Sequence, residues 1–288
     1  MEPKEINHNF YHGFTLVEIL VVMAIVMVLG GLGFSSLTGL QRTVRLNEYT
    51  ATLEQQISDI QRAAMLLERK SDENWLYGLG IDMTKMVGSE SVGTFTAFKW
   101  CSRHKDYGSN DTKAKIPNYN LRNAEKLSSC ANRNRLEGSG CLPADSANDY
   151  SLSSCASVSE SRLVLLSGYG MGTEAPLSTI EIVKTNNCGT GEAPDITAAR
   201  YILFESVSGR TFFYDDVGNI INYDWGSTNG ALNEGCVQDL VIKIKPLDTR
   251  GESSTRCIKV TNLGGKVTSE VASDGCCTGE ISEKCDHD

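Results

Sequence analysis

The first hundred residues of this chain contain no cysteine, and no proline stands between residues 4 and 116. The absence of proline removes the strongest helix breaker from that stretch. Positive charge is also scarce, because 27 basic residues face 36 acidic ones and leave a net charge of −9. This balance argues against a protein whose main role is nonspecific nucleic-acid binding, which needs a cationic surface.

Motifs of common enzyme sites are missing as well. The sequence has no nucleophile elbow, phosphate-binding loop, HExxH zinc motif or dinucleotide fingerprint. The glycines between Gly168 and Gly172 lack the strand–turn–helix context of a dinucleotide site. We therefore expect no enzyme activity and no cofactor.

The ten cysteines all lie beyond residue 100. An even number on one side of an apolar segment indicates disulfides formed in an oxidising compartment. Neighbouring Cys276 and Cys277 are expected to pair with different partners, and the spacing leaves the connectivity open. The candidates are Cys101, Cys130, Cys141, Cys155, Cys188, Cys236, Cys257, Cys276, Cys277 and Cys285.

Metal sites are the alternative for two groups of residues. Cys276, Cys277, Cys285 and His287 could form a ligand set, but the chain has no pair of CxxC knuckles and only four histidines. A second group of residues, rich in side-chain oxygens, could contribute calcium ligands. It lacks the spacing of an EF-hand loop, and we prefer the interpretation that it forms a turn between strands. That group is Asp215, Asp216, Asn219 and Asp224. We expect no metal.

One long apolar run covers residues 14–34 (FTLVEILVVMAIVMVLGGLGF), and its 21 residues could cross a bilayer as a helix. Glu18 stands inside this run, where a carboxylate costs about 2.5 kcal/mol or more on insertion. A cleaved signal peptide should begin with basic residues, yet residues 1–13 carry a net charge of −1. A simple anchor explains the length of the run but not Glu18.

Residues 13–18 (GFTLVE) closely resemble the GFTLxE motif of type IV prepilins and type II secretion pseudopilins. The resemblance implies that a prepilin peptidase cuts between Gly13 and Phe14 and that Phe14 is then N-methylated. It also implies that Glu18 neutralises the N-terminal amine of a neighbouring subunit. Such a cation and buried carboxylate would satisfy each other only in the assembled filament.

A second helical pattern follows at residues 35–70. Its apolar positions recur every three or four residues, as on one face of a helix, at Leu53, Ile57, Ile60, Ala64 and Leu67. A similar face begins with Leu37, Leu40 and Val44. We expect one helix from residue 14 to about 69, in which Gly30, Gly31 and Gly33 permit either a local bend or close helix packing.

Residues 71–288 are predicted to form a β-rich head with a net charge of −8, since the leader carries −1 and residues 14–70 balance. Alternating apolar and polar residues predict short antiparallel strands after one long helix, an α+β, pilin-like fold. The predicted strands are 161–166, 179–184, 200–205, 210–214, 239–245, 256–261 and 266–268. Residues 101–157 indicate a disulfide-stapled insertion, with a disordered linker as the alternative.

Two head segments, 202–209 and 256–267, are similar to the core of the GspH/FimT pseudopilin group. Some members of that group bind DNA through arginines near the C terminus, and the matching positions are Arg250, Arg256 and Lys266. A lysine replaces the expected arginine and the head is acidic. We therefore expect a solvated surface there and not a nucleic-acid site.

The resulting interpretation is a minor pilin or pseudopilin with a leader (1–13), a transmembrane half-helix (14–34), an amphipathic half-helix (35–70) and a head (71–288). It implies a single-pass protein of the bacterial inner membrane with its head outside the cytoplasm. The implied partners are the prepilin peptidase and N-methyltransferase, other pilins or pseudopilins, the inner-membrane assembly platform and the lipid bilayer. The alternative is a filament-tip module for DNA uptake or adhesion.

Overall fold

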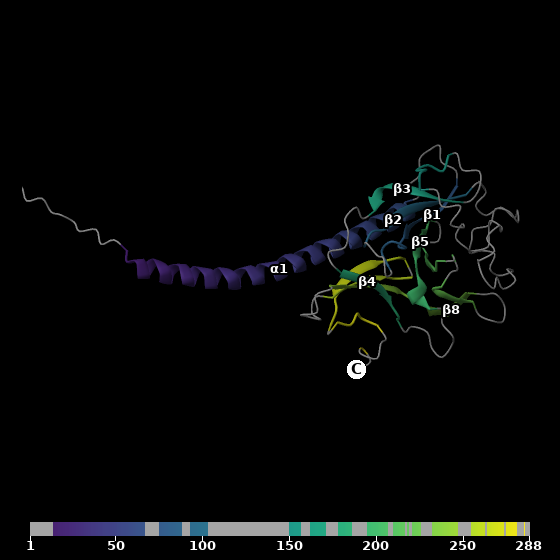
Figure 1. Cartoon of the computed structure of the whole chain (residues 1–288). Coiled ribbons are helices and arrows are strands. Elements are labelled where there is room, and N and C mark those ends of the chain that lie inside the picture. Colours follow the sequence, from purple (N-terminus) through teal and green to yellow (C-terminus); the bar gives the residue numbers. More distant parts are fainter. Residues whose placement is uncertain are drawn as a thin grey trace, which may run out of the picture. The chain divides into compact units, whose positions relative to one another are not determined.

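The computed structural model describes residues 14–66, 75–87, 93–102, 150–156, 162–170, 178–185, 195–206, 210–216, 218, 221–225, 232–246, 255–262, 264–273, 275–280 and 285. In these ranges one helix precedes eleven antiparallel strands, which confirms the α+β class (Figure 1). Several residues of the sequence predictions lie outside the described residues: Gly13, Leu67, Cys130, Cys141, Gly172, Cys188, Asn219, Arg250 and His287.

Helix α1 runs from Leu16 to Met65, so it begins and ends a few residues inside the expected interval. Gly30, Gly31 and Gly33 are part of this helix. The chain divides into two compact units, one ending at Arg45 and the other beginning at Leu46.

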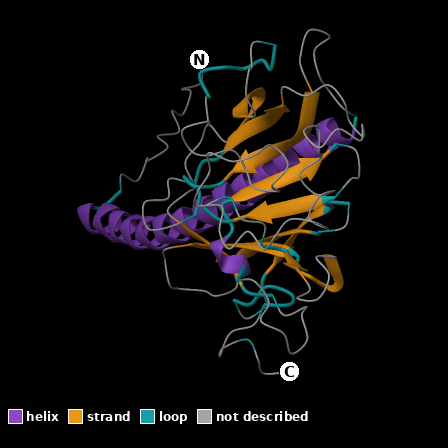
Figure 2. Cartoon of the chain, turned by 90° about the vertical axis from the view of Figure 1, so that its right-hand side faces the viewer, coloured by secondary structure: helices purple, strands orange, loops and turns teal. Residues whose placement is uncertain are grey.

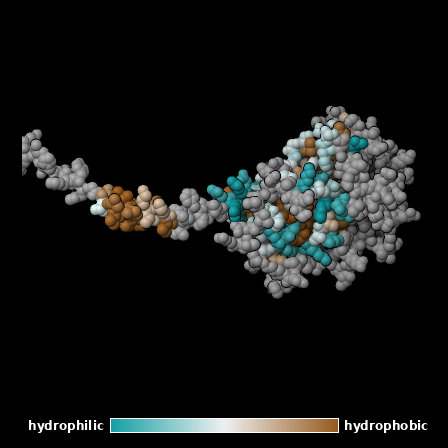
Figure 3. All heavy atoms as spheres, viewed as in Figure 1, coloured by the Kyte–Doolittle hydropathy of each residue, from teal (hydrophilic) through white to brown (hydrophobic). Residues whose placement is uncertain are grey.

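In the first unit, the apolar side chains between Phe14 and Leu29 are 52–79% exposed (brown in Figure 3). Among the described residues, no helix is both long and apolar enough to cross a membrane, so the span expected at residues 14–34 is not confirmed. Leu40 and Val44 are also exposed. Their spacing marks an apolar side of the helix without specifying what covers it.

In the second unit, one face of α1 is buried with the predicted period. Leu53, Ile57, Ile60 and Ala64 have no exposed surface, which confirms the spacing read from the sequence. Three further positions extend this face toward its N-terminal end and along its side: Leu46, Tyr49 and Ala63. Burying each large apolar side chain stabilises the folded state by about 1.5–3 kcal/mol. This face is therefore the main attachment of the helix to the sheets.

Two antiparallel sheets and a hairpin form the rest of this unit (Figure 2). The five-stranded sheet has the order β3 (Arg162–Gly170), β2 (Thr96–Ser102), β1 (Trp75–Asp82), β5 (Tyr201–Glu205) and β6 (Thr211–Tyr214). The four-stranded sheet has the order β11 (Val267–Val271), β10 (Arg256–Val260), β9 (Leu240–Pro246) and β4 (Ser178–Val183). Strands β7 (Tyr223–Trp225) and β8 (Leu232–Val237) pair with each other, and η2 (Ile196–Ala198) is a short 3-10 turn.

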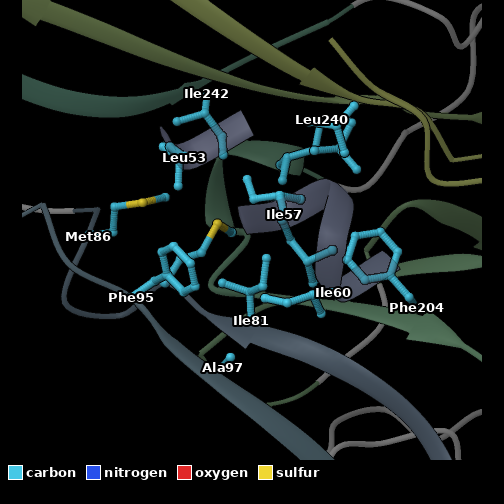
Figure 4. Close-up of a cluster of buried hydrophobic side chains, with 14 of the residues drawn as sticks. Leu53, Ile57, Ile60, Ile81, Met86, Phe95, Ala97, Phe204, Leu240 and Ile242 are labelled. Carbon is cyan, nitrogen blue, oxygen red and sulfur yellow. The ribbon is translucent and has the colours of Figure 1, made fainter. Parts of the chain in front are cut away.

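Both sheets contribute side chains to one core around the buried face of α1. In Figure 4 the helix side chains, including Ile57, lie between Ile81 of the five-stranded sheet and Leu240 of the four-stranded sheet. Successive side chains of a strand point to opposite faces. The outward positions of the five-stranded sheet form a second, aromatic cluster, in which Phe98 meets Tyr201 edge-on with ring centroids 6.4 Å apart.

The sequence reading missed β1, β2, β7 and β8. Strand β1 contains Gly78 and Gly80, and glycine is uncommon in strands, so its presence argues against predicting a strand from the sequence. The structure explains both residues. A Cβ on Gly78 would lie 2.3 Å from the carbonyl oxygen of Phe204, and a Cβ on Gly80 would lie 2.4 Å from the carbonyl oxygen of Ile202 and 2.4 Å from the Phe98 ring. The glycines therefore allow β1 to occupy the centre of its sheet under an aromatic side chain.

A glycine turn between β10 and β11 joins the two sheets. Gly265 adopts a φ of +61°, and a Cβ there would come within 2.7 Å of the Thr211 hydroxyl on β6. The N–H of Thr211 donates to the carbonyl of Asn262 at 3.2 Å, and the side-chain amide of Gln61 on α1 donates to the carbonyl of Gly264. This turn thus fixes the helix and both sheets at one point.

Tyr49 provides a test of the packing between α1 and the sheets. Its hydroxyl donates to the carbonyl of Gly93 at 2.5 Å, and burial raises the pKa of Tyr49 far above its usual value. A raised pKa favours the protonated folded state, so this contribution to stability is complete below about pH 10 and decreases as the pH rises further.

We predict that Tyr49→Phe lowers the free energy of unfolding by about 1 kcal/mol at pH 7, where only the hydrogen bond is lost. The variant should also lose less stability than the wild type between pH 9 and 11. Urea unfolding across this pH range measures both effects. An equal alkaline loss in the two proteins would show that Tyr49 is not the titrating group.

Candidate functional site: the start of α1 and the disulfide framework

The residues of the predicted processing motif form the N-terminal cap of α1. Thr15 precedes the first helical residue, Leu16, and Glu18 lies in the first turn. The N–H of Glu18 donates to the Thr15 hydroxyl at 3.2 Å, and the N–H of Thr15 donates to the Glu18 carboxylate at 3.4 Å. This reciprocal pair is a capping box, which satisfies two backbone donors that a helix start otherwise leaves unpaired.

The capping box gives Glu18 a partner within its own chain. Its carboxylate also lies in the first turn, where the positive end of the helix dipole stabilises an anion by about 0.3–1 kcal/mol. Phe14 and Glu18 are both exposed in the single chain. Sequence reasoning considered Glu18 only as the partner of another subunit and missed this local role, although Thr15 three residues earlier is the usual signal for it.

The two ends of the cysteine-rich region, Cys101 and residues 150–156, are anchored to the five-stranded sheet; we call them its stem. Cys101 at the end of β2 is bonded to Cys155, with their Cα atoms 5.5 Å apart. The Tyr150 hydroxyl donates to the carboxylate of Asp82 at 2.8 Å, and the N–H of Leu165 on β3 donates to the carbonyl of Leu152 at 2.8 Å. Residues 150–156 are therefore tied to three strands of the five-stranded sheet.

The remaining described disulfides lie beside the four-stranded sheet. Cys257 on β10 is bonded to Cys277, and Cys276 is bonded to Cys285. Neighbouring Cys276 and Cys277 thus pair with different partners, as expected from the sequence. No cysteine whose side chain the structure describes is free. The side chain of Cys236, on β8, is not among those described.

These bonds remove the alternative zinc set, because a metal needs thiolates and these sulfurs are oxidised. The ligand atoms of Cys276, Glu280 and Cys285 lie within 4.8 Å of one another, but two are in a disulfide and the third belongs to an ion pair with Lys243.

The calcium alternative receives no support within the described residues. Asp215 and Asp216 do not join a cluster of potential ligands there. The carbonyl of Asp215 instead accepts the N–H of Gly218 at 3.1 Å, which is the hydrogen bond of a turn after β6.

Arg256, one of the candidate DNA contacts, has a structural role. Its Nε donates to the Asn47 side chain on α1 at 2.9 Å, and its Nη1 donates to the carbonyl of Thr255 at 3.2 Å. The guanidinium therefore ties β10 to the helix. Lys266 is exposed, which agrees with the expected solvated surface.

Sequence reasoning missed one buried ion pair. Lys243 on β9 and Glu280 lie 2.6 Å apart (Nζ to Oε1), and their side chains are only 4% and 6% exposed. The alternation of β9 could have indicated that Lys243 shares a face with Val241. Nothing in the sequence indicates that a residue 37 positions later reaches it.

Comparison with known families gives one match: the prokaryotic N-terminal methylation motif, over residues 9–34. This match supports the type IV pilin and pseudopilin interpretation and indicates processing by a prepilin peptidase. No curated protein and no solved structure matches the chain.

The disulfide framework can be tested by peptide mapping of the exported protein without reduction. We expect linked peptides for Cys101–Cys155, Cys257–Cys277 and Cys276–Cys285, because each pair of Cα atoms is 5.5–5.8 Å apart, within the span of a disulfide. A link between Cys257 and Cys276 or Cys285 would contradict this arrangement. Reduced protein treated in parallel is the control.

Proposed function

We propose that this protein is a minor pilin or pseudopilin of the GspH/FimT type, a structural subunit of a type IV pilus or type II secretion filament. The match of residues 9–34 to the N-terminal methylation motif supports the pilin or pseudopilin part of this proposal, and the similarity of residues 202–209 and 256–267 to the GspH/FimT group is the basis for the subtype. Gly13 and Phe14 are the proposed cleavage site, with N-methylation of Phe14. The role is mechanical: the subunit initiates, caps or adapts the filament.

The exposed first unit supports assembly through α1. Apolar side chains from Phe14 to Leu29 are more than half exposed in the single chain, and burying them would be strongly favourable. A lipid bilayer before assembly and the helices of other subunits afterwards would provide that burial. We therefore propose insertion in the bacterial inner membrane, with the head outside the cytoplasm.

Glu18 has two successive partners in this proposal. In the free subunit its carboxylate accepts the N–H of Thr15. In the filament it would neutralise the α-amino group that cleavage creates on the next subunit. A carboxylate held in a capping box is already in place and keeps lone pairs for a second hydrogen bond. The assembly platform and the other pilins are the remaining proposed partners.

Recognition at the filament tip is a second candidate, favoured by the anchored stem of the cysteine-rich insertion. The disulfide Cys101–Cys155 and the contact of Tyr150 with Asp82 hold both ends of segment 103–149 on the five-stranded sheet. Binding residues are often carried by chain segments whose ends are held on a rigid scaffold. The acidic head argues against nucleic acid as the ligand.

The processing site predicts that Gly13→Ala yields a longer, uncleaved protein. The peptidase would have to accommodate a Cβ beside the cut bond, which glycine lacks. Intact mass and N-terminal sequencing, after expression with a prepilin peptidase, measure the outcome. Cleavage before Phe14 in this variant would contradict the assignment, and wild-type protein in the same cells is the control.

A pair of Glu18 variants separates charge pairing from helix capping. We predict that Glu18→Ala and Glu18→Gln are both processed but enter filaments at least about tenfold less than wild type, because a buried unpaired cation costs several kcal/mol. Glutamine retains the capping hydrogen bond and loses only the charge. Quantification of sheared filaments by immunoblot provides the measurement. Normal incorporation of Glu18→Gln would mean that capping, not charge, is what assembly requires.

A further inference from the structure

One row of paired residues crosses the whole four-stranded sheet. Cys257 on β10 is paired with Glu270 on β11 and with Lys243 on β9, and Lys243 is paired with Glu181 on β4. The neighbouring residues Ile242 and Ile258 belong to the core around α1. Because strand side chains alternate, the row lies on the opposite, outward face of the sheet.

The turn Cys277–Glu280, here called the clasp, binds this row strand by strand. Thr278 donates to Glu270 through its N–H at 2.7 Å and its hydroxyl at 2.9 Å. Cys277 is bonded to Cys257, and Lys243 Nζ donates to both carboxylate oxygens of Glu280 at 2.6 and 2.7 Å. Three residues of one short turn thus contact three neighbouring strands: Thr278 contacts β11, Cys277 contacts β10 and Glu280 contacts β9.

The clasp also reaches the β4 side of the sheet. Glu280 forms an isolated antiparallel bridge with Thr185, two residues beyond the end of β4. The turn itself is closed by the N–H of Glu280 donating to the carbonyl of Cys277 at 2.9 Å and the N–H of Cys277 donating to the Glu280 carboxylate at 2.9 Å. The Glu280 carboxylate is therefore held in place by its own turn as well as by Lys243.

Little apolar surface holds the clasp in place. Cys277 of the clasp packs in a cluster with only four other small or medium side chains: Val183, Val241, Cys257 and Ala272. The largest interaction, the Lys243–Glu280 pair, is almost fully buried, and a buried ion pair gains little beyond the cost of removing its charges from water. A covalent bond close to Glu280 is what raises its effective concentration at Lys243.

We infer that the clasp is an oxidation-dependent closure of the outward sheet face, set by the Cys257–Cys277 disulfide. When these cysteines are thiols, the clasp opens, the ion pair separates and Lys243 meets water. When they are bonded, Glu280 is held beside Lys243 and the face is closed. The head then reaches its final structure only in an oxidising compartment, and this does not depend on its role in a filament.

Closure requires a disulfide-carrying oxidant, such as a thiol–disulfide oxidoreductase or, in the test tube, oxidised glutathione. The thiolate of one cysteine attacks the oxidant's disulfide and releases one of its sulfurs as a thiolate. The thiolate of the other cysteine then attacks the mixed disulfide. Cys257 and Cys277 together lose two protons and two electrons, and the oxidant leaves reduced to two thiols.

The test measures the reactivity of lysine amines with an acetylating reagent in the folded, full-length protein, by mass spectrometry. Lys243 is the reporter of the clasp. Lys245 lies on the same strand with its side chain 43% exposed, and its labelling shows that the reagent reacts with an accessible lysine of this strand. Lys99 on β2 is buried in the other sheet and reports whether the head as a whole has opened. The double variant Cys257→Ser/Cys277→Ser is compared with Cys101→Ser/Cys155→Ser.

In oxidised wild type and in Cys101→Ser/Cys155→Ser, we expect Lys243 to remain protected. In Cys257→Ser/Cys277→Ser, Lys243 labelling should rise about tenfold or more while Lys99 stays protected, as in local opening. Mild reduction of wild type should have the same effect, and oxidised glutathione should reverse it. The inference fails if Lys243 stays protected without the bond, if it is already labelled in oxidised protein, or if Lys99 opens with it.

Discussion

The apolar face of α1 between Leu46 and Ala64 is the constraint on which the rest of the structure depends. Two sheets of different size pack on it and share one core. Neither sheet could bury its inner face without the helix, because the five-stranded sheet presents Ile, Leu and Phe side chains on that side and the four-stranded sheet presents Ile, Leu and Val. The glycine turn at Gly264–Gly265, which contacts α1 and β6, is possible only where the helix and both sheets already meet.

The outward faces of the two sheets are stabilised by different interactions. The five-stranded sheet carries large aromatic side chains such as Phe98 and Tyr214, which contribute substantial buried area. The four-stranded sheet carries Val241 and Lys243, which contribute little apolar surface. A covalent bond and an ion pair take the place of hydrophobic packing there, as is usual where apolar area is small.

At the start of α1, one short motif combines two physical roles. Thr15 and Glu18 begin the helix by satisfying its first backbone donors, and the same carboxylate provides the negative charge that the proposed filament contact needs. The large apolar residues that follow, as far as Leu29, are each more than half exposed in the single chain. The second unit therefore holds its own core, whereas the first exposes its apolar residues, which the proposed membrane and filament contacts would bury.

The sequence by itself determined the helix, its buried stripe, most strands and the processing motif, because these depend on local periodicity and on a short run of residues. The period of Leu53 and Ile57 requires no knowledge of a partner. Only the tertiary structure decided the central strand β1, since the space for Gly80 is defined by Phe98 on another strand. It also decided which cysteines meet and that Glu280 reaches Lys243, because contacts between residues far apart in the chain depend on how the sheets pack, which no local pattern encodes.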